Sequence, residues 1–210
     1  MKKDPESFIP STSRIEAFSD GVIAIILTIM VFEIKVPTSI KTGMASGQIL
    51  SELTAISPKF IAYALSFLLV AIFWVNHHSF FYSLARTSRA LLWHNNHLLF
   101  WLSLIPFPTA LLGEFPFETV TVMLYRLIVL GAAVAFNLMA FHADHANLYD
   151  QKISKKYIRK LNRKSLYGPV LYLTAVLLAP LSVYISLGIY ILIPVIYFLP
   201  ARIIEAIDSE

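Results

Sequence analysis

The sequence predicts an all-α membrane protein with six transmembrane helices, and composition is the first reason. Hydrophobic residues make up 57% of the 210 residues and charged residues 14%, whereas soluble globular chains have about 45–50% apolar and about 25% charged residues. A water-soluble domain of this size could not cover so much apolar surface. The apolar residues also gather into segments of roughly 20 residues, long enough to cross a hydrocarbon core as helices. Cys is absent, which excludes disulfides and thiolate metal sites.

The spans are expected to form a single domain over residues 1–210, because no internal repeat divides the chain. Transporters commonly place their site between repeated halves, so an unrepeated bundle must find its pathway elsewhere. The axis of a symmetric oligomer is one natural place. The six spans are expected at residues 13–35, 55–85, 90–112, 119–148, 166–182 and 184–204.

Polar segments and prolines mark the limits of the first three spans. The first follows a polar N-terminal segment and ends before Pro37, and a polar loop is expected to continue to about Thr54. The second is rich in Phe, Leu and Ala and ends at a basic turn, residues 86–89. The third contains Pro106 and Pro108, which a membrane helix tolerates where neighbouring groups satisfy the freed carbonyls.

The last three spans are separated by an acidic and a basic connection. An acidic turn at residues 113–118 leads into the fourth span, which is expected to continue helically toward Tyr149. Residues 150–165 are rich in Lys and Arg and are expected to form a basic loop. Two short apolar spans then close the chain.

The distribution of cations indicates the orientation. With both termini in the cytoplasm, most of the 17 Lys and Arg residues fall on the inner side; Lys35, Lys41 and Lys59 fall outside, and Arg126 lies within the fourth span. This bias follows the positive-inside rule and predicts a multi-pass protein of the cell membrane. Topology therefore explains the net charge of +4 without nucleic-acid binding, and the cluster at residues 152–164 could also touch anionic lipid headgroups.

Ionisable side chains enter the first span, where they are expensive unless they are paired or hydrated. Arg14 and Asp20 lie on different faces of the same helix, so each needs a partner elsewhere. The second and third spans place His77 and Asn95 at the same side of the membrane. We expect Asp20, His77 and Asn95 to form a buried polar network that holds the first span. The alternative is that Arg14 and Asp20 lie hydrated at headgroup level.

The apolar part of the first span has two different faces. The small residues Gly21, Ala24 and Thr28 share one face, which suits close helix packing. On its own, the other face could simply meet lipid or the bundle core. That second face is large and apolar, with residues that recur at spacings of four and three: Phe18, Val22, Ile25, Ile29 and Phe32.

Six His residues raise the question of a metal protein or a membrane enzyme. His94 and His97 are three residues apart, and His142, Asp144 and His145 lie close together near the end of the fourth span. Neither group has the spacing of a known metal motif, and the chain has no GxSxG, P-loop or HExxH segment. We expect no enzyme activity, no metal and no other cofactor.

Three blocks in the first three spans are more specific than composition. They are Arg14-x-x-x-Phe18-Ser19-Asp20, Phe73-Trp74-x-x-His77-His78 and Pro106-Phe107-Pro108-Thr109. Together they resemble the endosomal/lysosomal transmembrane potassium channel family, and the first block is similar to its RxxxFSD signature. Spans four to six match the family only in number and length, and the chain has the length of its single-repeat bacterial members.

The resemblance implies a potassium-selective channel that lacks the TVGYG filter, which is absent from this chain. Family members assemble as homotetramers of six-helix subunits, and the first span of each subunit lines the pore. The family's constriction falls on Ile25, two further hydrophobic layers fall on Ile29 and Phe32, and the pore-facing threonine falls on Thr28. Phe32 departs from the smaller aliphatic residue usual at that layer. Potassium is the permeant ion.

The signature residues are expected to join the polar network rather than to line the constriction. That network comprises Arg14, Phe18, Ser19, Asp20, Trp74, His77 and Asn95. A different class of function remains open, a proton-coupled secondary transporter with Asp20 and His77 as a relay. The role of Thr28 is also open, since its hydroxyl could bond to the backbone at residue 24 instead of facing a pore.

Overall fold

A computed structural model describes residues 11–179 and Gly188, and every regular element in residues 11–179 is a helix. The all-α class is therefore confirmed. The elements are α1 (Thr12–Ile29), the 3₁₀ helix η2 (Met30–Glu33), α2 (Ser46–Ala55), α3 (Ser57–Tyr82), α4 (Arg89–Ser103), α5 (Pro106–Glu114), α6 (Thr119–His145), α7 (Lys155–Ser165) and α8 (Tyr167–Leu178).

Four segments of the described chain are long and apolar enough to cross a membrane, and they correspond to the first four predicted spans. They are Thr12–Glu33, Ser57–Tyr82, Arg89–Glu114 and Thr119–His145. Helix α8 covers the beginning of the fifth predicted span, residues 166–182, up to the limit of the described residues. The sixth predicted span, residues 184–204, lies outside them apart from Gly188, so it stays a prediction.

Two segments predicted as loops are helical instead. Helix α2 occupies the last part of the expected polar loop and ends one residue beyond Thr54, at Ala55. Its start is capped because the Gln48 side chain accepts the N–H of Ala45 at 3.1 Å. Helix α7 lies within the expected basic loop at residues 150–165. The Ser154 hydroxyl accepts the N–H of Tyr157 at 3.2 Å and caps it.

The third predicted span is interrupted, and the fourth ends earlier than expected. Pro106 has no N–H to donate to the preceding turn, and the chain breaks there into α4 and α5. The Thr109 hydroxyl donates to the Ile105 carbonyl at 2.8 Å, which satisfies one group beside the break. Helix α6 ends at His145, because Asn147 adopts a φ of 51° in the left-handed region, so the helix does not reach residue 148.

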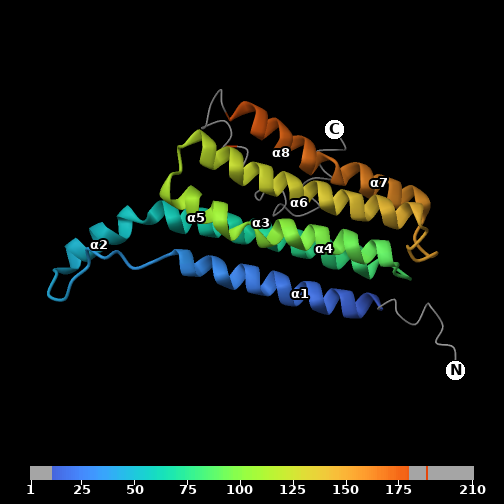
Figure 1. Cartoon of the computed structure of the whole chain (residues 1–210), viewed down its shortest axis with the longest axis horizontal. Coiled ribbons are helices and arrows are strands. Elements are labelled where there is room, and N and C mark those ends of the chain that lie inside the picture. Colours follow the sequence, from blue (N-terminus) through green and yellow to red (C-terminus); the bar gives the residue numbers. More distant parts are fainter. Residues whose placement is uncertain (1–10, 180–187, 189–210) are drawn as a thin grey trace, which may run out of the picture.

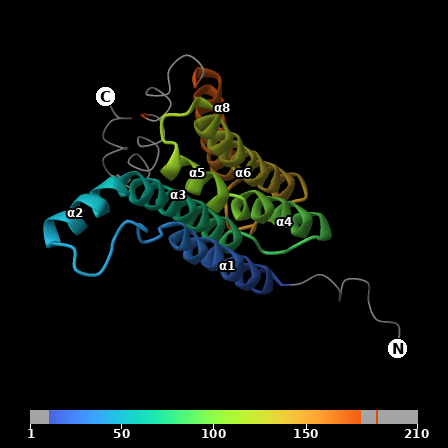
Figure 2. The same ribbon diagram turned by 60° about the vertical axis from the view of Figure 1, so that its left-hand side comes forward.

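The helices form a bundle in which α1 lies at one edge (Figures 1 and 2). Helix α4 packs along α6, α1 packs against α3 and α4, and α8 lies against the other side of α6. The α4–α6 contact requires a glycine, because a Cβ at Gly131 would lie 2.4 Å from the Trp101 ring. Among the described residues, no other helix covers the outer half of α1.

The α3–α4 connection and the segment after α6 meet at one end of the bundle. The Leu148 carbonyl accepts the N–H of Ala85 at 2.9 Å, and the Ser83 carbonyl accepts the N–H of Asp150 at 3.0 Å. Arg86 donates to the Asn147 carbonyl at 3.1 Å. Because α7 follows directly, this end carries most of the cations of the described chain, and we call it the basic end.

Candidate functional site

Helix α1 buries one face and exposes the large apolar face that its sequence predicts. Ile15, Ser19, Ile23 and Ile26 are buried against α3 and α4. The exposed face runs along the helix from the basic end to the opposite end. Four of its five predicted residues are exposed, and the fifth, Val22, is half-buried. The exposed fractions are 58% for Phe18, 57% for Ile25, 43% for Ile29 and 73% for Phe32.

The small residues of α1 lie on the same exposed half of the helix. Gly21, Ala24 and Thr28 are all exposed, and a Cβ at Gly21 would meet nothing within 4 Å. The Thr28 hydroxyl donates within its own helix, to the carbonyls of Ala24 at 3.0 Å and Ile25 at 2.9 Å. Its proton is therefore used by the backbone, while the oxygen lone pairs remain available as acceptors on the exposed side.

A buried polar network joins α1 to α3 and α4 near the basic end. Asn95 donates from Nδ2 to the Ser19 hydroxyl at 3.0 Å, and that hydroxyl donates to the Ile15 carbonyl at 2.9 Å. The Oδ1 atom of Asn95 lies 2.8 Å from His77 Nε2. Because an amide oxygen can only accept, His77 must donate from Nε2. Asn95 thus connects three helices in one chain of hydrogen bonds.

The structure places Asp20 outside this chain of bonds, contrary to the expectation that it would bond with His77 and Asn95. Asp20 is exposed, and its Oδ1 accepts the indole N–H of Trp74 at 2.8 Å. Ser19 takes the buried position instead, because it is one residue earlier and points about 100° away around the helix, toward α3 and α4. Arg14 and Phe18 are also exposed, and Arg14 forms no ion pair with a described residue.

The sequence interpretation missed a second buried network, which lies behind α1 among α3, α5 and α6. Thr109 Oγ1 lies 2.8 Å from Ser66 Oγ, and Ser66 Oγ lies 2.9 Å from the Tyr125 hydroxyl. The signal was available, because Thr109 ends the Pro-Phe-Pro-Thr block and Ser66 is a polar residue inside an apolar span. This network fixes α5 after the proline break.

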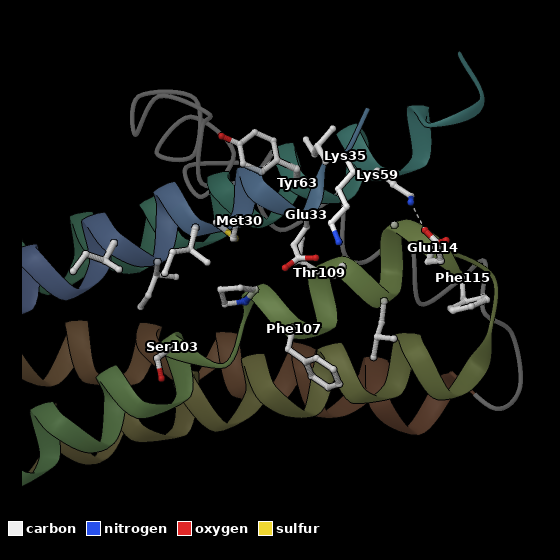
Figure 3. A pocket seen from close by; sticks show the side chains of 18 of the residues that line it. Met30, Glu33, Lys35, Lys59, Tyr63, Ser103, Phe107, Thr109, Glu114 and Phe115 are labelled. Carbon is white, nitrogen blue, oxygen red and sulfur yellow. Dashed lines mark ion pairs between the residues drawn. The ribbon is translucent and has the colours of Figure 1, made fainter. Parts of the chain in front are cut away.

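An open groove borders the exposed face of α1 on the side away from the basic end (Figure 3). Its volume is about 890 Å³, and Ile25 and Ile29 line it together with residues of η2, α3 and α5. Glu33 and Lys59 lie at its outer part, where Lys59 forms an ion pair with Glu114. The described helices thus leave space beside the second half of α1 and beside η2.

The His residues near the basic end do not assemble a metal site in the described part of the chain. The rings of His94 and His142 lie with their centroids 5.0 Å apart, and His142 also bonds to Ser88 at 3.1 Å. No group of three or more His, Asp or Glu side chains converges within residues 11–179. A tetrahedral site needs at least three such ligands.

Comparison with known proteins agrees with the blocks in the first three spans. Residues 14–106 match the model of the family described as endosomal/lysosomal potassium channel TMEM175. A potassium channel of Chamaesiphon minutus is 39% identical over 202 residues, which cover 94% of this chain and 97% of the relative. A potassium channel of a Chryseobacterium species is 35% identical and covers 91% of this chain and 95% of its own length.

The fold of the chain also agrees with this family. A crystal structure of a lysosomal potassium-selective channel TMEM175 homologue from Chamaesiphon minutus superposes with a TM-score of 0.78 at 35% identity, and covers 90% of this chain and 96% of its own. The similarity thus extends beyond the block-bearing spans to nearly the whole length. The chain is a membrane protein that belongs to the TMEM175 channel family.

Proposed function

We propose that the chain is the subunit of a potassium-selective homotetrameric channel, with α1 of each subunit lining the central axis. The observation that carries the proposal is the exposed face of α1 at the edge of the bundle. Lipid contact alone explains the exposed surface of α1 poorly, because Thr28 is exposed beside Ile25 and the Asp20 carboxylate is exposed on the flank, about 140° around the helix from Ile25. Ionisable and polar side chains in membrane helices face a water-filled path or another helix.

In this assembly Ile25, Ile29 and Phe32 form three stacked hydrophobic rings, with Ile25 as the constriction. A narrow apolar passage empties of water, and an ion enters only by shedding part of its hydration shell. Potassium holds that shell less tightly than sodium, so the rings favour potassium. No carbonyl filter contributes, since TVGYG is absent from the sequence. Selectivity is therefore weaker than in channels with such a filter.

Thr28 lies between the Ile25 and Ile29 layers and provides the polar part of the passage. The bonds to Ala24 and Ile25 direct the hydroxyl proton toward the helix. Four threonines would then present oxygen lone pairs toward the axis. Oxygen acceptors replace water around a cation, whereas a hydroxyl proton pointing at the axis would repel it.

The buried network is the anchor for the pore helix in this proposal. Ser19, Asn95 and His77 hold α1 at a fixed rotation against α3 and α4, and the bond from Trp74 holds Asp20. A fixed rotation keeps Ile25 directed at the axis. The whole chain then forms one six-helix domain of the cell membrane, with both termini cytoplasmic and no cofactor besides the permeant ion.

The exchange Ile25→Asn tests the constriction. Reversal potentials in liposomes under opposing potassium and sodium gradients should move toward the value of a channel that does not discriminate between the two ions. The reason is that a ring of four asparagines holds water in the constriction, so an ion need not shed its hydration shell. Ile61→Asn on α3 is the matched control, since Ile61 is also 57% exposed but does not lie on α1. An unchanged reversal potential in Ile25→Asn would show that Ile25 is not the constriction.

The same assay separates the channel from the proton-coupled transporter. A channel passes potassium only down its electrochemical gradient, whereas a carrier would accumulate potassium against it when a proton gradient is imposed. Asp20 and His77 form separate hydrogen bonds, to Trp74 and Asn95 respectively. We therefore expect purely dissipative flux, with no potassium accumulation driven by protons.

A further inference from the structure

Helix α7 has an unusually strong separation of charged and buried residues. At about 100° per residue, all six of its cations fall on one half of the helix. The other half contains Ile158 and Asn162, which are buried where α7 packs on α6. The cations are Lys155, Lys156, Arg159, Lys160, Arg163 and Lys164, and all of them are exposed. We call this half the cationic face.

No carboxylate of the described residues forms an ion pair with the cationic face, although Asp144 lines a shallow pocket together with Lys155 and Arg159. Within residues 11–179 the ion pair of the chain is Lys59–Glu114, at the opposite end of the bundle. Asp144 is the acidic residue adjacent to α7, and Asn162 approaches it at 3.5 Å from the buried side. Six cations that form no ion pair with a described residue, on a helix of about 16 Å, create a strong positive potential that favours an anionic partner.

The position of α7 places part of this face at the membrane surface. Ser165 and Asn137 are joined by two hydrogen bonds, of 2.6 and 3.2 Å, so the end of α7 lies beside α6 about 12 Å before the end of that helix. Helix α6 has 27 residues, about 40 Å, which exceeds a hydrocarbon core of about 30 Å. Arg163 and Lys164 therefore lie near the headgroup layer, where long cationic side chains reach the lipid phosphates.

The surface continues from the cations onto apolar residues in line with them. Helix α8 follows α7 with only Leu166 between them, and the two run end to end beside α6 (Figure 1). Tyr167, Val170 and Leu171 are exposed and fall on the same half of the helix as the cationic face. Tyr is typical of the interface between headgroups and acyl chains.

We infer that the cationic face and the adjoining surface of α8 form a binding site for anionic phospholipid. Arg163 and Lys164 contact the headgroup phosphate, and the acyl chains lie along Val170 and Leu171. The continuity from charge to apolar surface matches a phospholipid and not a soluble polyanion, which would have no use for exposed Val and Leu. Lys155 and Lys156 lie about 12 Å farther from α8 and contribute only to the general potential.

Lipid selectivity of the reconstituted full-length channel tests the inference. Trace spin-labelled phosphatidylglycerol or phosphatidylcholine is added to phosphatidylcholine bilayers, and the fraction of motionally restricted label gives the relative association. We expect a preference for phosphatidylglycerol that weakens at high salt, because screening reduces it. Arg163→Gln with Lys164→Gln should lower the preference at least about twofold, since each cation near a charged surface contributes up to about fivefold.

Two variants serve as controls. Lys155→Gln with Lys156→Gln removes the same charge from the same helix and should retain most of the preference. Arg163→Lys keeps the charge and should behave like the unmodified chain. Absence of any preference in the unmodified chain, or equal losses from the two paired substitutions, would overturn the inference and leave only a non-specific basic surface. The readout needs no ion flux, so its result is independent of the proposed channel activity.

Discussion

Thr28 is the single hydroxyl residue between Gly21 and Phe32, and its bonding defines its proposed role. Thr28→Val keeps the shape and removes the acceptor oxygen. If the oxygen replaces a hydration water, potassium conductance should fall roughly two- to tenfold, as expected for a net loss of about 0.5–1.5 kcal/mol per hydrogen bond. Potassium preference should weaken while the tetramer stays intact. Bilayer recordings of single channels measure both quantities.

A second threonine provides the control for this exchange. Thr174 on α8 is exposed and donates to the Val170 carbonyl at 2.8 Å, as Thr28 does to Ala24. Thr174→Val removes the same type of bond away from α1 and should leave conductance unchanged. If Thr28→Val also conducts normally, the hydroxyl serves only its own helix, and selectivity rests on the hydrophobic rings.

The site could be predicted at residue level only in part. The sequence placed His77 and Asn95 at the depth of the signature motif, and they do meet there. It did not show that Ser19 takes the buried position while Asp20 bonds to Trp74. Adjacent residues on a helix differ by about 100°, and which of them is buried depends on the rotation of α1, which only packing determines.

At the scale of the elements, α1 is held mainly by the chain of bonds through Asn95. Asn95→Leu removes the partner of both Ser19 and His77 and leaves them buried without it, at a cost of about 1–3 kcal/mol for each group. We expect the tetramer to shift toward monomer or aggregate in size-exclusion chromatography in mild detergent. Asn96→Leu, on the exposed side of the same helix, should elute unchanged. A stable Asn95→Leu tetramer with altered current would instead assign the network a direct role in conduction.

Predictability differed among the elements for physical reasons. Long apolar runs predicted α1, α3 and α6, because a helix satisfies its own backbone in a membrane and about 20 continuous apolar residues fit a spanning helix and not a barrel strand. Helix α7 was missed because its six cations suggested a loop. Its helical form depends on burial of Ile158 and Asn162 against α6. This is a tertiary contact, which cannot be inferred from the composition of the segment. Pro106 was visible in the sequence. The sequence alone does not show whether a membrane helix continues through this proline or breaks before it, because that depends on the neighbouring helices.

At the scale of the whole molecule, the helices described between residues 11 and 179 leave no passage through their packed centre. Leu69, Leu98 and Val129 fill the bundle, and each is no more than 1% exposed. The exposed face of α1 lies on the outside of this core, so a pathway along it has only one wall in a single subunit. A fourfold arrangement supplies the other three walls with the same residues, which is why the proposed function depends on assembly.

The absence of cysteine makes this assembly directly testable, because an introduced cysteine has no native thiol to pair with. In the proposed tetramer four copies of residue 25 surround a constriction too narrow for a hydrated ion. Ile25→Cys should therefore form disulfide-linked dimers on mild oxidation, since pairing requires Cα atoms within about 4.4–6.8 Å. The dimers should be visible on a non-reducing gel, disappear with reductant, and form to the same extent when the protein is diluted in detergent.

Ile61→Cys, equally exposed on α3, should remain monomeric on the gel. Cross-linking that falls with dilution, or that is equal in both variants, would reflect random collision and would place α1 away from a common axis.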